Sequence, residues 1–438
     1  MLRATVVGGG LAGCEAAWAL AEHGVQVTLR EMRPLVRTAA HQTDRLAELV
    51  CSNSFKSTET TNAHGLLKAE LLRLGSLLLR AAEEARVPAG AALAVDREIF
   101  STLVHERIMA HPRITVQRGE VTELPSPGIV ATGPLTSQAL AAAISKRLGE
   151  TALAFYDAIA PIVSRESLDE ERLYALSRYG KGDGDDYLNA PLSREEYEAF
   201  VGALVAADQF TAHDFDQVPY FEGCLPVEEM ARRGPETLRF GPMKPVGLPD
   251  PRSGREPWAA IQLRREDRTG QMWNLVGFQT RLRIPEQQRV FRMIPGLAQA
   301  EFLRYGSIHR NSYINSPSAL DYGLAARSDA SLFFAGQITG VEGYTESLGT
   351  GLLAGINLAR RLAGTPLTEP PPTTMLGGLC RYLREADPRH FQPMNANFGL
   401  LDPLGSGDAG DKKMRKDAKK QALVDRAMRE FETWMRQL

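Results

Sequence analysis

The alternation of hydrophobic and polar positions at the start of the chain predicts a strand, a helix and a second strand in close succession. Thr5–Val7 is a short run with strand character, Leu11–His23 is rich in alanine, and Val25–Leu29 alternates like a strand. A strand–helix–strand unit of this kind typically begins a parallel sheet that is covered by helices. The pattern therefore predicts an α/β fold.

Similar signals continue along the chain. Two leucine- and alanine-rich stretches, Asn62–Ala85 and Arg97–Met109, predict helices, and Ile114–Val116 and Gly128–Ala131 predict strands. A strand followed by glycines and a helix returns at Ser331–Arg361. Between these regions, from about residue 158 to residue 308, the pattern is less regular.

This order predicts a nucleotide-binding domain that is split by an insertion. We expect the first part of the nucleotide-binding domain over residues 1–157, an inserted substrate domain over 158–308, and the second part over 309–370. The proline-rich stretch Thr365–Thr374 leads into a C-terminal helical segment over 371–438. The predicted fold class is α/β, with a Rossmann-like nucleotide-binding domain, an inserted α+β domain and a C-terminal helical segment.

Composition narrows the class of protein. Hydrophobic residues make up 43% and charged residues 24% of the chain, and no apolar run approaches the roughly 20 residues of a membrane span. The first residues lack the pattern of a signal peptide, so we expect the mature chain to begin there. The four cysteines, Cys14, Cys51, Cys224 and Cys380, are far apart, which argues against a metal site or a disulfide framework. We therefore expect a cytoplasmic protein without a membrane partner or bound metal.

The net charge of −2 gives no support for nucleic-acid binding by the chain as a whole, so any RNA contact needs a local basic patch. The C-terminal segment from Asp411 to Leu438 carries nine basic and five acidic residues and is the best candidate. A solvated amphipathic helix would have the same pattern.

A glycine-rich turn between the first predicted strand and helix carries the G-x-G-x-x-G spacing of a dinucleotide site. Its residues are Gly8, Gly9, Gly10, Leu11, Ala12 and Gly13. In such a turn the first glycine permits the tight bend, the second lets a pyrophosphate approach the backbone, and the third lets the helix pack on the sheet. Glu31 closes the second strand, where its carboxylate can accept hydrogen bonds from ribose hydroxyls.

Two further segments favour FAD over NAD. Thr132 and Gly133 follow a predicted strand, as in the second nucleotide-contact segment of many flavoproteins. The strand that ends at Gly336 and Gln337 is followed by Gly349, Gly351 and a helix predicted over Leu352–Arg361, whose N-terminus could face a pyrophosphate or flavin ring. Ordinary strand–loop–helix packing is the alternative for this last segment.

Two of the cysteines lie in segments that suit chemistry. Cys51 is flanked by polar residues and by Lys56, which could favour a thiolate, and Cys224 lies between aromatic residues and a proline. Cys14 and Cys380 have surroundings that suggest packing.

Long segments of the chain resemble the TrmFO (Gid) family of folate- and FAD-dependent tRNA (uracil-5-)-methyltransferases. They cover nearly the whole chain and include GGGLAG at Gly8, ELVCSNSFKS around Cys51, YLNAPLSREEYEAF, FEGCLPVEEMARRG around Cys224, LRFGPMKPVGL, HRNSYINSP, and LFFAGQITGVEGYTESLGTGLLAGINLARR. The larger GidA flavoproteins share the flavin segments but carry an extra helical domain, for which this chain is too short.

The resemblance implies an activity and roles for individual residues. The enzyme would methylate C5 of uridine 54 in the tRNA T loop, with 5,10-methylenetetrahydrofolate as carbon donor, reduced FAD as reductant and NAD(P)H as electron donor. Cys224 would add to C6 of the uracil and Cys51 would act as the base or beside the flavin, although the reverse assignment is open. The candidates for binding substrate are Tyr220, Phe221, Arg283, Glu342 and Tyr344, and Arg281 and Arg289 join Arg283 as candidates for the folate tail.

The expected partners are tRNA and folate, and no obligate protein partner is evident. Two alternatives remain at this point. One is an FAD-dependent oxidoreductase of a small molecule, which would leave the two cysteine segments without a role. The other is a tRNA-modification partner without chemistry of its own, in which neither Cys51 nor Cys224 would matter.

Overall fold

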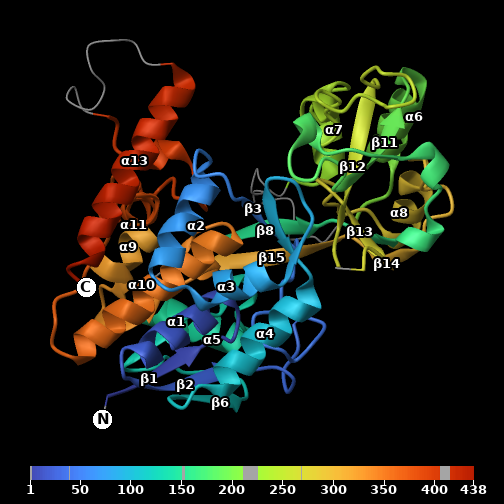
Figure 1. The fold of residues 1–438 in the computed structure, drawn as a ribbon. Coiled ribbons are helices and arrows are strands. Elements are labelled where there is room, and N and C mark those ends of the chain that lie inside the picture. The colour runs from blue at the N-terminus through green and yellow to red at the C-terminus, as the bar shows by residue number, and fades with distance from the viewer. Residues whose placement is uncertain (1, 39, 150–152, 211–224, 268, 405–414) are drawn as a thin grey trace.

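A computed structural model of the chain describes residues 2–38, 40–149, 153–210, 225–267, 269–404 and 415–438. Figure 1 shows a large lower part that contains both the N-terminal sheet and the C-terminal helices, and a smaller part at the upper right. The two parts have separate hydrophobic cores. Within the described residues, no helix is both long and apolar enough to cross a membrane.

The large part is built on a six-stranded sheet in the order β16-β17-β7-β1-β2-β6. Its strands are β1 (Arg3–Val7), β2 (Gln26–Glu31), β6 (Ile114–Arg118), β7 (Gly128–Val130), β16 (Ala325–Ala326) and β17 (Asp329–Phe334). All neighbouring pairs are parallel except β16 with β17. Strands from the two ends of the sequence therefore form one doubly wound sheet, as the α/β prediction requires.

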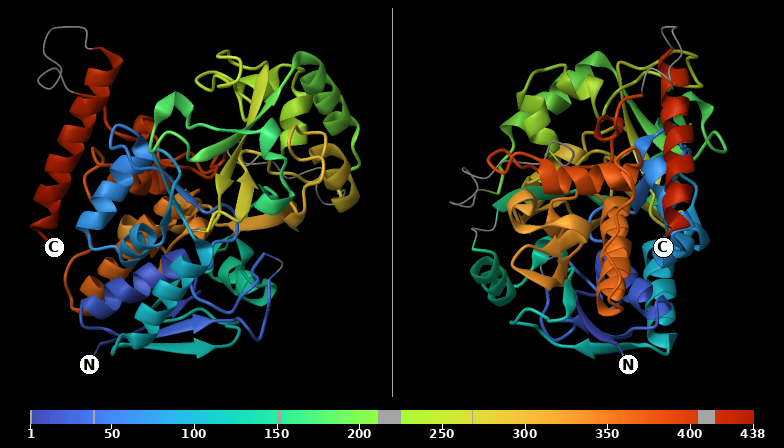
Figure 2. Two further views of the ribbon diagram at one scale, coloured as in Figure 1. Left: turned by 45° about the vertical axis from the view of Figure 1, so that its right-hand side comes forward. Right: turned by 90° about the vertical axis from the view of Figure 1, so that its left-hand side faces the viewer.

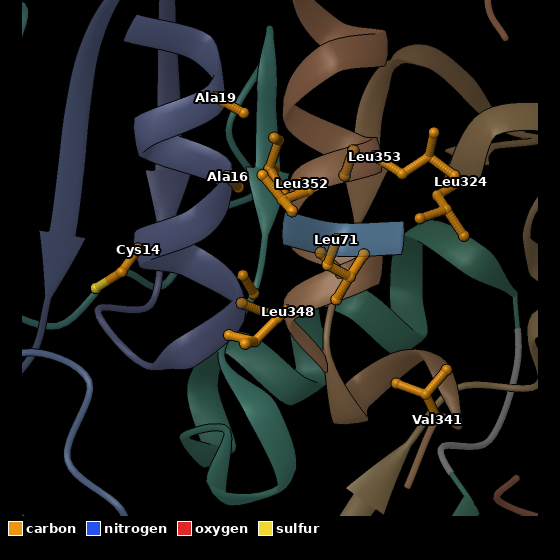
Figure 3. Close-up of a cluster of buried hydrophobic side chains, with 14 of the residues drawn as sticks. Cys14, Ala16, Ala19, Leu71, Leu324, Val341, Leu348, Leu352 and Leu353 are labelled. Atoms are coloured by element: carbon orange, nitrogen blue, oxygen red, sulfur yellow. The ribbon is translucent and has the colours of Figure 1, made fainter. Parts of the chain in front are cut away.

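Two helices from the two ends of this domain pack closely together against the sheet. They are α1 (Leu11–Glu22) and α10 (Tyr344–Leu362), and Figure 3 shows Ala16 and Ala19 of α1 facing Leu352 of α10. A Cβ atom on Gly351 would lie 2.4 Å from the Ala12 carbonyl oxygen, so only glycine permits this approach.

Other helices surround this sheet, beside a small antiparallel sheet in the order β3-β5-β4. The elements are β3 (Ser54–Ser57), α2 (Ala63–Arg73), α3 (Leu77–Glu84), β4 (Arg86–Val87), β5 (Ala92–Val95), α4 (Arg97–Ala110) and α5 (Gln138–Leu148). The prediction of one helical stretch over Asn62–Ala85 was wrong in one respect, because this part of the chain forms two helices, α2 and α3. Gly75 has φ of 82°, and the Ser76 hydroxyl accepts a hydrogen bond from Leu79 N–H to begin α3.

The smaller part is an antiparallel sheet in the order β10-β11-β12-β13-β9-β14, with helices packed against it. Its elements are β9 (Ile162–Ser164), β10 (Tyr174–Ala175), β11 (Tyr187–Leu192), α6 (Arg194–Ala206), α7 (Val227–Arg232), β12 (Ala259–Arg265), β13 (Met272–Leu275), α8 (Ile284–Phe291) and β14 (Phe302–Arg304). We call this part the inserted sheet region. It is joined to the large part by the antiparallel pair β8 (Leu153–Ile159) and β15 (Ser307–Tyr313).

The last part of the chain adds helices to the core of the large part. The short helix α9 (Ser316–Ala319) precedes α10, and α11 (Met375–Glu385) and α13 (Lys416–Met435) follow it. Figure 2 shows α13 in red along one side of the molecule. Trp434 of α13 donates from Nε1 to Thr368 Oγ1 at 2.7 Å. The predicted fold class is confirmed, whereas the exact domain boundaries stay predictions.

Candidate functional site

The glycine-rich turn between β1 and α1 forms the floor of a cleft at the carboxyl ends of the parallel strands. Gly8 has φ of 108°, and an added Cβ would lie 2.4 Å from the Ala131 carbonyl oxygen. A Cβ on Gly13 would lie 1.8 Å from the Gly8 carbonyl oxygen, whereas a Cβ on Gly10 would meet nothing within 4 Å. Gly8 and Gly13 therefore serve the packing of strand and helix, and Gly10 leaves open space on the cleft side.

This cleft contains about 1020 Å³ of empty space, a volume that includes solvent at its open mouth. Most of the predicted cofactor residues line it: Gly8, Gly9, Gly10, Leu11, Ala12, Glu31, Thr132, Gly133, Gly336 and Gln337. No side chain of the described residues caps the N-terminus of α1, so its first amide groups can receive an anion such as a pyrophosphate.

Glu31 holds a carboxylate in the wall of the cleft. Its Oε2 accepts from Gly9 N–H at 2.9 Å, and its Oε1 accepts from Arg33 N–H at 2.9 Å and Arg33 Nε at 3.0 Å. Burial opposes ionisation of Glu31, but the hydrogen bonds and the charge of Arg33 outweigh it and lower the pKa. An ionised acceptor, an uncapped helix terminus and the open face of Gly10 together fit a dinucleotide.

The glycines after β17 lie differently from the expectation. The helix expected over Leu352–Arg361 begins at Tyr344, so Gly349, Gly351 and Leu352 are inside α10 rather than at its N-terminus. Leu352 is buried, and none of the three is among the residues that line the cleft. Gly351 packs against α1. The geometry does not support a cofactor role for Gly349, Gly351 or Leu352.

Cys51 lies in the segment Leu49–Asn53, directly after Val50. Val50 and Tyr344 line the cleft, whereas Cys51 itself is not among its lining residues. The Tyr344 hydroxyl accepts from Cys51 N–H at 3.0 Å and Ser52 N–H at 3.1 Å, and it donates to the Ser52 carbonyl at 2.8 Å. Tyr344 was predicted to bind substrate, and the structure shows that its hydroxyl fixes the backbone beside the cysteine.

Arginines that the sequence did not single out hold the same segment. Arg97 donates to the Leu49 and Cys51 carbonyls at 2.6 and 2.9 Å, and Arg304 donates to the Val50 carbonyl at 2.8 Å. Their guanidinium charges lie next to the cysteine, where they would stabilise a thiolate. Burial lowers the pKa of Arg304, and the nearby charge of Arg97 lowers it further.

Lys56, which was expected to act on Cys51, acts on the Glu346 carboxyl, and its effect on Cys51 stays a prediction. Burial opposes ionisation of the Glu346 carboxyl, but its hydrogen bond with His64 and the charge of Lys56 lower its pKa. Cys14 and Cys380 are buried, and burial raises the pKa of both thiols well above the ordinary value. These two cysteines are suited to packing, as expected.

The remaining predicted substrate residues are spread over the molecule. Cys224, Tyr220 and Phe221 lie outside the described residues. Glu342 accepts from Gln337 Nε2 at 2.6 Å, which places it beside the cleft. Arg283 is exposed at the start of α8.

The other two folate candidates, Arg281 and Arg289, have acidic partners. Arg289 pairs with Glu286 at 2.6 Å on α8, and Arg281 pairs with Glu229. A folate role for either arginine, and for Arg283, stays a prediction.

The basic C-terminal segment is a packed helix over its described part. Val424, Ala427 and Phe431 are buried in the core of the large part, and the buried Arg426 donates to the backbone carbonyls of Asp402 and Pro403. Lys419 is exposed. The described part of α13 is thus an amphipathic helix that packs on the large part. An RNA contact through the exposed face of α13 stays a prediction.

Comparison with known proteins places the chain in a family. Residues 3–366 match the model of the family described as glucose inhibited division protein A. The chain is 58% identical over 433 residues to a methylenetetrahydrofolate--tRNA-(uracil-5-)-methyltransferase TrmFO of Geobacter sulfurreducens, covering 98% of each chain. It is 54% identical over 437 residues to the TrmFO of Thermus thermophilus, covering 99% of this chain and 97% of that one.

A solved structure of Aquifex aeolicus GidA shares the fold, with a TM-score of 0.69 at 15% identity, over 99% of this chain and 73% of that chain. The sequence matches extend over nearly the full length of both TrmFO relatives. The chain therefore belongs to the glucose inhibited division protein A family and, within it, to the TrmFO family.

Proposed function

We propose that this protein methylates C5 of a tRNA uridine, uridine 54 of the T loop, with 5,10-methylenetetrahydrofolate as the carbon donor. The relatives that match it over their full length carry this activity, without the nucleotide position, in their names. The observation that carries the proposal is the position of Cys51, because the preceding Val50 and Tyr344, whose hydroxyl binds the Cys51 N–H, both line the dinucleotide cleft. A cysteine nucleophile or base and a reductant would thus meet in one place.

The cleft residues fit FAD. The N-terminus of α1 and Gly10 would receive the pyrophosphate, and Glu31 would accept from a ribose hydroxyl. When bound, reduced FAD would supply the two electrons that convert a carbon at the oxidation level of formaldehyde into a methyl group. NAD(P)H is the proposed source of those electrons.

Uracil C5 is a poor nucleophile until a thiolate adds to C6. We assign this addition to Cys224 and the removal of the C5 proton to Cys51, whose thiolate Arg97 and Arg304 would stabilise. The proton leaves C5 after the new carbon–carbon bond has formed, and elimination then releases the cysteine. The target base must leave its stack to reach these groups, which favours a loop nucleotide.

The experiment is a transfer assay with unmodified tRNA, NADPH and radiolabelled methylenetetrahydrofolate. Label should appear in tRNA, and S-adenosylmethionine should not replace the folate. Oxidation of NADPH without labelled tRNA would favour the small-molecule oxidoreductase. Labelling of tRNA by the Cys51→Ala and Cys224→Ala variants at the wild-type rate would exclude the proposed chemistry. If the wild-type protein binds tRNA but transfers no label, the result would favour a non-catalytic partner.

A further inference from the structure

The backbone on both sides of Cys51 is held by a side chain that is itself held from the inserted sheet region. Arg97, at the start of α4, donates from Nη1 to the Leu49 carbonyl at 2.6 Å and from Nη2 to the Cys51 carbonyl at 2.9 Å. Its Nε donates to Glu266 Oε2 at 2.6 Å. The Glu266 side chain is 1% exposed and follows β12 directly. One planar guanidinium thus joins the cysteine segment to the inserted sheet.

A second set of contacts runs from the same strand to the residues after Cys51. Arg264 of β12 donates to Asn53 Oδ1 at 3.0 Å and to Ser52 Oγ at 3.1 Å. Asn53 returns a hydrogen bond from Nδ2 to the Arg265 carbonyl at 2.9 Å. The end of β12 therefore contacts the cysteine segment directly through Arg264 and Arg265, and Glu266, which follows them, is linked to it through Arg97.

We propose that Arg97 and Glu266 are positioning residues that couple the place of the Cys51 thiol to the place of the inserted sheet region. A bidentate guanidinium fixes two carbonyl groups at once, and a buried carboxylate fixes the plane of the guanidinium. A substrate that shifts the inserted sheet on binding would then shift Cys51 through this ion pair. The expected effect of Arg97 and Glu266 on methylation rests on the proposed function, but their effect on the position of the Cys51 thiol does not.

Charge and position can be separated by substitution. Among the described residues, Arg97, Arg264 and Arg304 donate hydrogen bonds to this segment, Glu266 pairs with Arg97, and Tyr344 contributes its hydroxyl. Arg97→Gln removes a positive charge and should move the pH midpoint of Cys51 alkylation upward, while Glu266→Gln removes a negative charge and should move it downward. Arg97→Lys keeps the charge but cannot span two carbonyl groups and the carboxylate.

The test uses the full-length holoprotein and two readouts. The first is the rate of alkylation of the Cys51 peptide by iodoacetamide against pH, measured by mass spectrometry without tRNA or folate. The second is kcat and KM for tRNA. The matched controls are Arg107→Lys and Glu84→Gln, an exposed ion pair that also involves α4.

We expect Arg97→Lys and Glu266→Gln to keep their flavin and to lose about tenfold or more in kcat. The midpoints should shift in opposite directions for Arg97→Gln and Glu266→Gln, and both controls should behave as the wild type. Wild-type kcat and alkylation in both Arg97→Lys and Glu266→Gln would overturn the proposal. If there is no methylation at all, the alkylation profiles still decide whether the two residues place Cys51.

A measurement on the unaltered protein covers the case in which the variants do not fold. Hydrogen exchange of the peptide that contains Cys51 and Ser52 should change when a T-arm stem-loop binds, together with exchange at the end of β12. A change at β12 without any change at Cys51 would contradict the coupling.

Discussion

The hydroxyl of Tyr344 accepts a hydrogen bond from the backbone N–H of Cys51 at 3.0 Å, although the two residues are 293 positions apart in the sequence. Tyr344 is the first residue of α10, and Cys51 follows the first strand–helix–strand unit and its loop. The contact therefore closes one side of the dinucleotide cleft with a segment from each half of the split domain.

Removing this hydroxyl should loosen the cysteine segment without removing the ring. In Tyr344→Phe the N–H groups of Cys51 and Ser52 lose their acceptor, which costs about 1–3 kcal/mol where the groups stay unsatisfied. The ring contact with Phe55, at 5.5 Å between centroids, should remain. We expect a lower free energy of unfolding in urea and faster alkylation of Cys51. Tyr382→Phe, which removes a hydroxyl that donates to the Gln392 carbonyl, is the control, and equal effects in both variants would contradict this role.

The glycines of the cofactor turn should respond differently to substitution. Gly10→Val should fold and be colourless, because its Cβ meets open space in the protein but would occupy the path of the pyrophosphate. Gly13→Ala should fail to fold normally, because its Cβ would lie 1.8 Å from the Gly8 carbonyl oxygen. Absorbance of released FAD and the thermal unfolding temperature separate the two effects. A Gly10→Val protein with full flavin would contradict the assignment of the cleft.

The glycine turn and α10 also show which features of the site can be predicted from the sequence. The turn from Gly8 to Gly13 and the carboxylate of Glu31 were predictable because the motif is local and lies between a recognisable strand and helix. The start of α10 was not, because Gly349 and Gly351 resemble loop residues. Gly351 is needed inside the helix only because α1 passes close to it.

The arginines around Cys51 could not be predicted from sequence patterns, for a different reason. Arg97, Arg264 and Arg304 come from distant parts of the chain, and each has the local pattern of a solvated residue. They become a cluster only when the inserted sheet packs against the segment Leu49–Asn53. The one sequence feature that could have indicated these arginines is the mostly apolar run of residues 259–263, which is followed directly by Arg264 and Arg265.

Stability should depend on the protonation of Glu70. This carboxyl on α2 is fully buried and accepts from the N–H groups of Met375 and Leu376, each at 2.8 Å. Burial raises its pKa from 4.5 to about 8, so its contribution to stability is present below pH 4.5 and is lost as pH rises towards 8. The loss is at most about 1.4 kcal/mol per pH unit for one proton.

The variant Glu70→Gln should therefore show a shallower decline in the free energy of unfolding over that pH range. Some decline should remain, because burial also raises the pKa of Glu15 to about 7. Glu83→Gln, at an exposed site, is the control and should keep the wild-type slope. An unchanged slope in Glu70→Gln, measured by urea unfolding at several pH values, would show that Glu70 does not titrate in this way.

The roles of the two cysteines can be assigned with tRNA that carries 5-fluorouridine at the target position. This base has no C5 proton to lose, so the adduct that forms on C6 should accumulate after carbon transfer. Cys224→Ala should abolish the covalent complex on a denaturing gel, while Cys51→Ala should lose turnover and still form some adduct. The opposite result would exchange the roles, and adduct in both single variants would exclude a unique nucleophile.

The central claim is that the methyl carbon comes from folate and ends on C5 of a T-loop uridine. Methylenetetrahydrofolate that carries two deuterium atoms on its methylene group tests this directly, with unmodified tRNA, NADPH and mass spectrometry of nuclease fragments. We predict that one T-loop fragment becomes heavier by a methyl group that retains both deuterium atoms. A methyl group without deuterium, or oxidation of NADPH with no change in any tRNA fragment, would contradict the account.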